Sequence, residues 1–387
     1  MSRLQKISCE VEFITPAFLG NATQQGQWRV PPFKALLRRW WRILKAKDYG
    51  YDWRQLREAE GLLWGNAFLE KPHLPGHKNG HQQALIRLRL GNWRMGNLDN
   101  NDWKQFRFGK QKATSSAQYA IDVDVYLGFG AVLPPSKKQK RKFKELAHAP
   151  AIADGEQATL QLLLQDENHS ALAREILGLV HHFGSLGSRA NNGWGSVQCM
   201  IDGRKVSLPR IPARDWQACL ELDWPHAFGK DAKGYLIWAS APVNDWIDAL
   251  KQIARAKADV RDLAKALPAF NRRKPTAVFL LGYPVQGPHE LDSAKELRWP
   301  SPLRFKVQRL DDGAYRVLAF HLPHRPPPAI WALFNSQKRR WAEETQVELW
   351  DRIHAYFDKD SEWSRWGGAD EYRYRKDLAG QGGGVGA

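Results

Sequence analysis

The 387-residue chain is longer than one typical domain, and its strand-like and helix-like segments follow a regular order. In the first half this order is strand, helix, strand, strand, helix, strand, with one extra strand. A looser version follows a proline-containing connector at 206–224. These observations predict an α+β fold of tandem ferredoxin-like (RRM-like) domains with insertions. The expected domains are 1–205 and 206–366, with a mobile tail at 367–387.

In the first half, each element is predicted from the spacing of its apolar residues. Alternating apolar and polar residues predict strands at 7–13, 84–90, 119–127, 158–165 and 195–201. Apolar residues at helical spacing predict helices at 31–47, 56–69 and 171–183. Pro31 and Pro32 suit the first turn of the first helix, where proline is tolerated. Many domains with this order bind no RNA, so the order alone assigns no function.

The second half is predicted by the same criteria. Strands are expected at 235–240, 276–283, 303–310 and 315–321. Helices are expected at 244–257, 260–267 and 329–357, the last with a break in its middle. This set is compatible with a second ferredoxin-like unit that carries additions.

The charge of the chain favours a polyanionic partner. Lys and Arg number 58 against 41 Asp and Glu, which gives a formal net charge of +17. Such a field attracts polyanions, of which nucleic acid is the commonest, although a basic surface with no dedicated ligand stays open. No stretch approaches the roughly 18 apolar residues that cross a bilayer, and the N-terminus has no apolar signal core. We therefore expect a cytoplasmic protein that does not bind membranes.

Cysteine and tryptophan usage adds two expectations. Cys9, Cys199 and Cys219 are few, odd in number and far apart, which predicts buried reduced thiols rather than disulfides or a metal pair. The 18 tryptophans are expected to divide between the core and surfaces that stack on bases or bury against partner subunits.

A glycine-rich segment at 183–197 carries the strongest local motif. Glycines let the backbone approach a ligand closely, and exposed backbone N–H groups can hold phosphate beside the cationic Arg189. The segment lies between a predicted helix and a predicted strand and lacks the GK[ST] of a phosphate loop. On chemistry alone, RNA contact and a merely tight helix-to-strand connection both remain open.

A second motif combines a turn at 15–20, a segment at 29–32 that leads into a helix, and the basic face of that helix. The basic residues of this helix include Lys34, Arg38, Arg39 and Arg42. They could follow a phosphate backbone. An isolated basic stripe is usually a solvated helix face, so this alternative also stays open.

These two motifs, in this order, resemble the RAMP superfamily of CRISPR proteins, and most closely subunit one of the Cmr (type III-B) effector complex. The resemblance rests on the Thr-Pro-x-Phe-x-Gly turn at 15–20, the Arg-x-Pro-Pro at 29–32, the tryptophan-rich helix at 39–42 and the glycine-rich segment at 184–196. Weaker matches lie at 281–284 and 301–303. The sequence departs from the family at Gly20-Asn21, where Gly-Gly is common, and at Lys34-Ala35, where Lys-Gly is common.

The resemblance implies tandem ferredoxin-like domains in an antiviral ribonucleoprotein that uses a guide RNA (crRNA) to recognise target RNA. It places the subunit at the head of a filament near the 3′ end of the guide RNA, in contact with other Cmr/RAMP subunits. It also implies a non-catalytic role. We expect no cofactor and no metal. By position, the implied RNA contacts are Lys34, Arg38, Arg39, Arg42, Gly184, Gly187, Arg189 and Asn192. Trp40 and Trp41 are expected in the core.

An alternative function is a RAMP-type, metal-independent endoribonuclease that processes guide RNA. His181 and His182 would supply the acid and base, although two histidines at a helix end also suit the helix dipole. A scaffold whose charge only meets acidic neighbours is a third possibility. Convergence of Arg38, Arg42 and Arg189 on one groove would favour RNA binding, and different directions would weaken that interpretation.

Two further groups could bind a metal. Asp122 and Asp124 fall on one face of a predicted strand, but this is more simply the wet face of an amphipathic strand. His73, His77 and His81 recur every fourth residue, but nearby proline and glycine oppose a helix there, so we expect no metal site.

Overall fold

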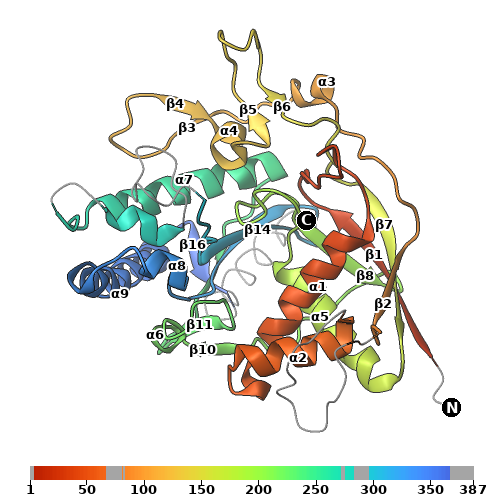
Figure 1. The fold of residues 1–387 in the computed structure, drawn as a ribbon. Coiled ribbons are helices and arrows are strands. Elements are labelled where there is room, and N and C mark those ends of the chain that lie inside the picture. Colours follow the sequence, from red (N-terminus) through yellow and green to blue (C-terminus); the bar gives the residue numbers. More distant parts are fainter. Residues whose placement is uncertain (1–3, 67–80, 82, 272–274, 283–295, 367–387) are drawn as a thin grey trace, which may run out of the picture. The chain divides into compact units, whose positions relative to one another are not determined.

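The structure is a computed structural model, and it describes residues 4–66, 81, 83–271, 275–282 and 296–366. Two compact units are present (Figure 1). The first comprises Met1–Gly109, Asp122–Pro212 and Lys306–Asp311, and the second comprises Lys110–Ile121, Ala213–Phe305 and Asp312–Ala387. Each unit thus takes a short segment from the other half of the chain. The expected mobile tail at 367–387 lies outside the described residues.

The first unit is built on one antiparallel sheet with the order β2-β7-β1-β8-β9. Along the chain its elements are β1 (Gln5–Phe13), α1 (Val30–Lys45), β2 (Arg87–Leu90), β7 (Gln157–Leu164), α5 (Glu167–Phe183), β8 (Val197–Ile201) and β9 (Arg204–Lys205). The predicted order of strand, helix, strand, strand, helix, strand is therefore present. Alternation explains the central strand, in which Ile7, Cys9 and Val11 are buried while Ser8 and Glu10 are exposed.

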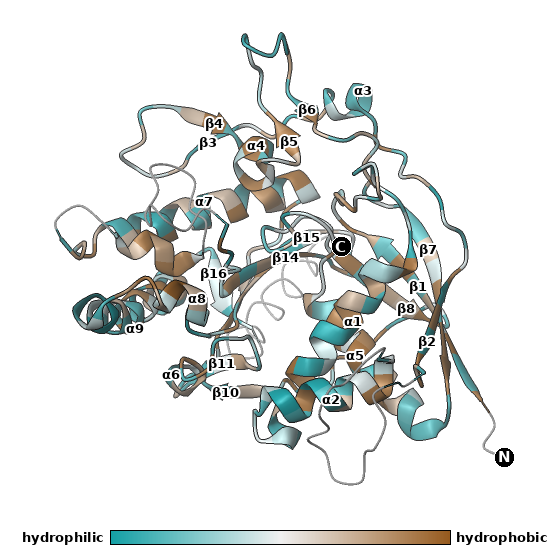
Figure 2. Cartoon of the chain, in the orientation of Figure 1, coloured by the Kyte–Doolittle hydropathy of each residue, from teal (hydrophilic) through white to brown (hydrophobic). Residues whose placement is uncertain are grey.

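Helix α1 has the two faces that its sequence predicts. Prolines occupy its first turn, and its buried residues are Phe33, Leu36, Leu37, Trp40, Trp41 and Ile43. Figure 2 shows hydrophilic and hydrophobic residues next to one another along this helix. A 3₁₀ turn (Ala46–Tyr49) ends at Gly50 with φ +59°, and α2 (Trp53–Trp64) then starts at its N-cap Asp52. The predicted helix at 56–69 therefore begins earlier, and its last three residues lie outside the described ranges.

The excursion between β2 and β7 holds only short elements. They are α3 (Asn100–Trp103), β3 (Lys110–Lys112), β4 (Ala120–Asp122), α4 (Val123–Gly128), β5 (Val132–Leu133) and β6 (Glu145–Leu146). Of the predicted strand at 119–127 only Ala120–Asp122 is a strand, and the rest of the prediction is wrong because the chain turns into α4 after Asp122. Val123 and Leu127 are both buried and lie on the same side of one helical turn. A short apolar pattern of this kind fits either a strand or a helix, and tertiary packing decides between them.

The second unit contains most of a sheet with the order β14-β15-β13-β16, in which the residues of β14 from Lys306 on belong to the first unit. Along the chain its main elements are β13 (Ile237–Ser240), α7 (Trp246–Lys265), β14 (Leu303–Arg309), β15 (Tyr315–His321), α9 (Ser336–Lys359) and β16 (Trp363–Arg365). The two large sheets therefore share one connectivity. In the first sheet β7 lies between β2 and β1, and β8 lies on the other side of β1. In the second sheet β15 lies between β14 and β13, and β16 lies on the other side of β13.

Smaller elements correct three predictions in the second half. The connector at 206–224 contains β10 (Ala213–Asp215) and α6 (Trp216–Cys219), and β10 joins β11 (Phe228–Asp231) and β12 (Gly234–Tyr235) in a small sheet. The two helices predicted over 244–267 are the single helix α7. The predicted strand at 276–283 is the 3₁₀ helix Ala277–Leu281, because a short apolar run fits either form. The last helical region, predicted to break in its middle, breaks near its start, between α8 (Pro328–Trp331) and α9, which then runs without interruption.

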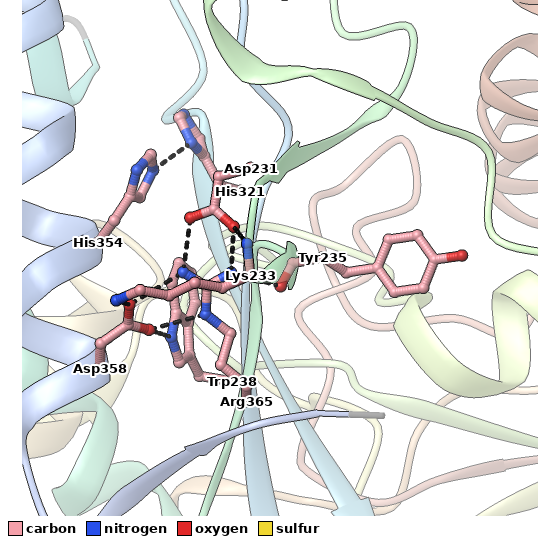
Figure 3. A network of polar contacts seen from close by, with 8 residues as sticks. All are labelled: Asp231, Lys233, Tyr235, Trp238, His321, His354, Asp358 and Arg365. Carbon is pink, nitrogen blue, oxygen red and sulfur yellow. Dashed lines mark hydrogen bonds and ion pairs between the residues drawn. The ribbon is translucent and has the colours of Figure 1, made fainter. Parts of the chain in front are cut away.

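A polar network fastens β16 to the rest of the second unit (Figure 3). The guanidinium of Arg365 pairs with Asp231 at 2.8 Å and with Asp358 at 2.7 Å, and it lies 5.2 Å from the ring centre of Trp238. Asp358 also accepts hydrogen bonds from Trp238 Nε1 at 2.8 Å and from Lys233 Nζ at 2.9 Å. Burial alone would raise the pKa of Asp358, but these donors hold it below its usual value.

A buried histidine pair lies beside this network. His321 Nδ1 and His354 Nε2 are 2.9 Å apart (Figure 3). The His321 ring also stacks on Trp350, with centroids 4.0 Å apart. One ring nitrogen must donate and the other accept, so at least the accepting ring is neutral in this arrangement. Burial lowers the pKa of His354 to about 3 and holds the pKa of His321 well below 6.5.

The remaining sequence expectations concern cysteine and membranes. All three cysteines are free and buried, as predicted. Within the described ranges, no helix has the length and apolar character needed to cross a membrane.

Candidate nucleic-acid interface

The turn at 15–20 and the glycine-rich segment lie against each other. Strands β1 and β8 pair with Phe13 opposite Val197, so the chain leaving β1 meets the chain entering β8. Thr15 Oγ1 donates to the Gly193 carbonyl at 2.7 Å and accepts from the Ser196 N–H at 3.1 Å. The two motifs that were separate in the sequence thus form one loop pair in the first unit.

Backbone crowding explains why glycines occupy this loop pair. At Gly187, φ is +97° and a Cβ atom would lie 2.8 Å from the Phe18 carbonyl oxygen. At Gly184, a Cβ atom would lie 2.5 Å from the Val180 carbonyl oxygen. Both positions therefore require glycine for packing, whether or not RNA is bound.

Arg189 and Asn192 both hold the end of α4. Arg189 Nε donates to the Phe129 carbonyl at 2.8 Å, and Asn192 Nδ2 donates to the Leu127 carbonyl at 2.8 Å. Arg189 has φ +60°, an uncommon conformation for a residue with a side chain, yet it remains exposed. It can therefore fix the loop through one nitrogen and present its remaining N–H groups to a ligand.

Two arginines of the basic face of α1 share one buried carboxylate. Arg38 Nε lies 2.5 Å from Glu60, and Arg42 contacts Glu60 through Nε at 2.7 Å and Nη2 at 2.8 Å. The Glu60 side chain is 3% exposed, whereas those of Arg38 and Arg42 are 36% and 44% exposed. These cations are therefore held in place and are not a freely solvated stripe.

The other candidates on α1 have different surroundings. Lys34 is half-buried, and burial, together with the charge of Arg38, lowers its pKa. Arg39 is exposed, while Trp40 and Trp41 are buried as expected. Glu60 brings Arg38 and Arg42 together, whereas Arg189 is bound to Phe129. The described contacts thus divide the three arginines into two groups and do not join them at one point.

The histidines at the end of α5 have a structural setting. His181 is buried, and its Nδ1 lies 3.0 Å from the Cys199 carbonyl oxygen and 3.1 Å from the Cys199 nitrogen. Burial, with a contribution from the nearby Lys306 charge, lowers the pKa of His181 to about 3. His182 is half-buried, with its ring centroid 4.7 Å from that of His181.

Lys306 is a buried cation that the sequence motifs do not reveal. Its Nζ donates to the carbonyls of Val180 at 3.0 Å and Val197 at 2.6 Å, and also to the carbonyl of His181. It therefore lies where the dipole of α5 favours positive charge. Burial lowers its pKa to about 7. No local pattern could have found it, since it occupies an ordinary position in a strand.

Glu156 is a second polar residue found only in the structure. Its carboxylate accepts hydrogen bonds from Trp28 Nε1 at 3.0 Å, the Asn97 N–H at 2.8 Å and the Ala153 N–H at 2.8 Å. It thus ties the segment that leads into α1 to the chain around Asn97. This fixes the start of the helix that carries the basic residues.

The possible metal ligands that the structure describes do not form a site. Asp124 is not on a wet strand face, as its pattern suggested, but is buried in α4 and paired with Lys144 at 2.9 Å. Burial raises its pKa, while Lys144 opposes that shift. His73 and His77 lie outside the described residues, and His81 is exposed. Among the residues described, no group of three His, Cys, Asp or Glu side chains could hold a metal ion.

Comparison with known proteins gives one family match. Residues 10–198 match the model of the RAMP superfamily. No curated protein matches the chain.

Solved structures also show similarity to the chain. One is the crystal structure of apo Cmr1 from Pyrococcus furiosus, at 15% identity and a TM-score of 0.44, covering 84% of this chain and 90% of that one. Another is a chain of the type III-B Cmr-beta cryo-EM structure with cognate target RNA, at 12% identity and a TM-score of 0.41, covering 89% and 99%. A chain of a type IV-B CRISPR complex has 13% identity and a TM-score of 0.30, covering 53% and 95%.

Proposed function

We propose that the protein is a non-catalytic RNA-binding subunit of a type III-B (Cmr) CRISPR effector ribonucleoprotein. The proposal starts from residues 10–198, which belong to the RAMP superfamily. It would contact the guide RNA near its 3′ end, or target RNA, or both, and neighbouring subunits, in antiviral defence. The narrower Cmr assignment is supported by the motifs at 15–20, 29–42 and 184–196. We further propose that both units are ferredoxin-like domains in tandem, which the shared strand order of their large sheets supports.

The observation that carries the RNA-binding proposal is the pair of arginines on Glu60. Two guanidinium groups oppose one carboxylate, so one positive charge is left over at partly exposed side chains. Arg189 supplies a second exposed cation on the loop pair. A net charge of +17 favours the same class of partner.

The non-catalytic role is supported by the setting of His181. A buried imidazole with a pKa of about 3 is neutral near pH 7 and bound to the backbone of Cys199. It is therefore poorly suited to donate or accept protons at a scissile phosphate.

RNA binding by the purified chain tests the proposal. Labelled single-stranded RNA would be titrated across a salt series with wild type and with the triple variant Arg38→Gln, Arg42→Gln, Arg189→Gln. Weaker binding and a salt slope shallower by about 1.4 are expected if two phosphate contacts, one at Arg38 and Arg42 and one at Arg189, are lost. A gel would show whether the RNA stays intact, and unfolding curves would show whether the variant is folded.

A matched control removes the same charge elsewhere in the first unit. Lys137, Lys138 and Lys140 are exposed, and replacing all three by Gln also lowers the net charge by three. Equal losses in the two variants would mean that net charge alone governs binding. No binding by wild type would overturn the proposed function. RNA that is cut by wild type, but not by a His181→Ala, His182→Ala variant, would establish the endoribonuclease instead.

A further inference from the structure

The contact of Arg38 and Arg42 with Glu60 leaves hydrogen-bonding capacity unused. A guanidinium has five N–H donors. Arg42 gives two of its nitrogens to Glu60, and Arg38 gives its Nε. Because the two side chains remain 36% and 44% exposed, their other N–H groups can meet a second acceptor.

The charges at this contact favour that second acceptor being an anion. One carboxylate neutralises one guanidinium, while the other keeps its charge next to a like charge. Lys34 lies one helical turn before Arg38, and the positive charge of Arg38 contributes to its lowered pKa. An anion placed over the three side chains would relieve this repulsion.

The geometry also lowers the entropic cost of binding such an anion. Arginine side chains on a free surface must lose rotamer freedom when they bind phosphate. Here the two forks are already fixed by a carboxylate that is itself buried and carried by a second helix, α2. The planar guanidinium matches a phosphate bidentately once its orientation is set.

We propose that Lys34, Arg38 and Arg42 form a preorganised site for one phosphodiester group of RNA, and that Glu60 is the positioning residue of this site. This inference rests on the proposed RNA-binding function and adds to it a place, a ligand group and an acidic residue. Glu60 acts through the arginines and does not touch the RNA. The competing explanation is that the ion pairs only fasten α1 to α2.

Replacing Glu60 by Gln separates these explanations, because they predict opposite changes in RNA affinity. The variant gains one positive charge, so charge alone would strengthen RNA binding. Loss of positioning would weaken it, by about tenfold if one charge-assisted hydrogen bond to phosphate is lost. We expect Glu60→Gln to bind a labelled single-stranded RNA of mixed sequence about tenfold more weakly than wild type at the same salt concentration.

Asp48→Asn is the charge-matched control. Asp48 follows the same helix, pairs with Lys45 at 2.9 Å and is 55% exposed, so its replacement adds the same charge without touching Arg38 or Arg42. We expect unchanged or slightly tighter RNA binding. Arg42→Lys is the second test, since it keeps the charge and loses the fork, and weaker binding than wild type is expected. Because Arg42→Lys keeps Glu60, it still tests the phosphate site if Glu60→Gln does not fold.

The outcomes distinguish this inference from the proposed function. If wild type binds RNA and Glu60→Gln binds as tightly or more tightly, the positioning role is overturned while RNA binding stands. If Arg42→Lys binds like wild type, the preorganised phosphate site is overturned in the same way. If wild type does not bind RNA at all, the proposed function and this inference both fail.

Discussion

Thr15 and Gly193, 178 positions apart in the sequence, are joined by a 2.7 Å hydrogen bond from the threonine hydroxyl to the glycine carbonyl. The same hydroxyl accepts a hydrogen bond from the Ser196 N–H, and all of these groups are buried. One side chain therefore satisfies two backbone groups of the glycine-rich segment. The two motifs of the candidate interface depend on each other through this contact.

Thr15→Val should loosen the loop pair. The substitution keeps the shape of the side chain but removes the hydroxyl, which leaves the buried Ser196 N–H without this acceptor, while the Gly193 carbonyl keeps a hydrogen bond from Ser196 Oγ. We expect a loss of about 1–3 kcal/mol in the free energy of unfolding, measured by urea denaturation. Thr15→Ser keeps the hydroxyl and should cost clearly less. Equal losses in both variants would show that the methyl group, and not the hydrogen bonds, matters.

Gly195→Ala should be among the most damaging single substitutions in the first unit. Gly195 has φ +60°, and a Cβ atom would lie 1.9 Å from the Leu186 carbonyl oxygen. Gly203→Ala is the matched control, because Gly203 has φ +72° but no atom within 4 Å of the added carbon. We expect about 1 kcal/mol of destabilisation for the control, from backbone strain alone, and considerably more for Gly195→Ala. Similar unfolding midpoints would contradict the crowding at Leu186.

The buried histidine pair should make the protein sensitive to acid. The folded pKa of His354, about 3, and that of His321 lie below the ordinary value of 6.5, so the folded state binds fewer protons than the unfolded state. The stabilisation is therefore complete above about pH 6.5 and is lost as the pH falls towards the folded pKa values. We expect the free energy of unfolding to drop between pH 6.5 and 4.

His354→Gln tests the assignment of this pH dependence. The free energy of unfolding should fall less steeply between pH 6.5 and 4 than in wild type, because one titrating group is removed. The difference between the two slopes should correspond to about one bound proton. Urea denaturation at a series of pH values would measure it. A slope equal to that of wild type would exclude His354 as a source of the acid sensitivity.

Arg365→Ala should destabilise the second unit strongly. The Arg365 side chain is 13% exposed, and its loss leaves the carboxylates of Asp231 and Asp358 without their shared counter-ion. We expect a loss of about 3–5 kcal/mol, as for other broken buried ion pairs. Arg340→Ala is the control, because its pair with Glu344 has side chains 82% and 67% exposed and should contribute under about 1 kcal/mol. Thermal unfolding followed by tryptophan fluorescence would measure both, and comparable shifts would argue against a buried network.

The sequence by itself determined the features that depend on neighbouring residues along the chain. Local periodicity accounts for the buried and basic faces of α1, the alternation of β1 and the order of elements in the first unit. The spacing of side chains along a single helix or strand is enough to set these features. The same local reasoning predicted wrong elements at 123–127 and 276–283, where short apolar runs fit more than one form and packing decides between them.

Only the tertiary structure decided which charges are paired and which groups are buried. The sequence could not match Glu60 to Arg38 and Arg42, nor Lys306 to the carbonyls at the end of α5, nor Glu156 to Trp28, because each contact joins separate segments of the chain. The sequence named the arginines as candidate RNA contacts, but the exposure and orientation of their donors depend on a carboxylate from α2. Long-range contacts of this kind leave no periodic signal in the sequence, since they are set by how the helices and strands pack.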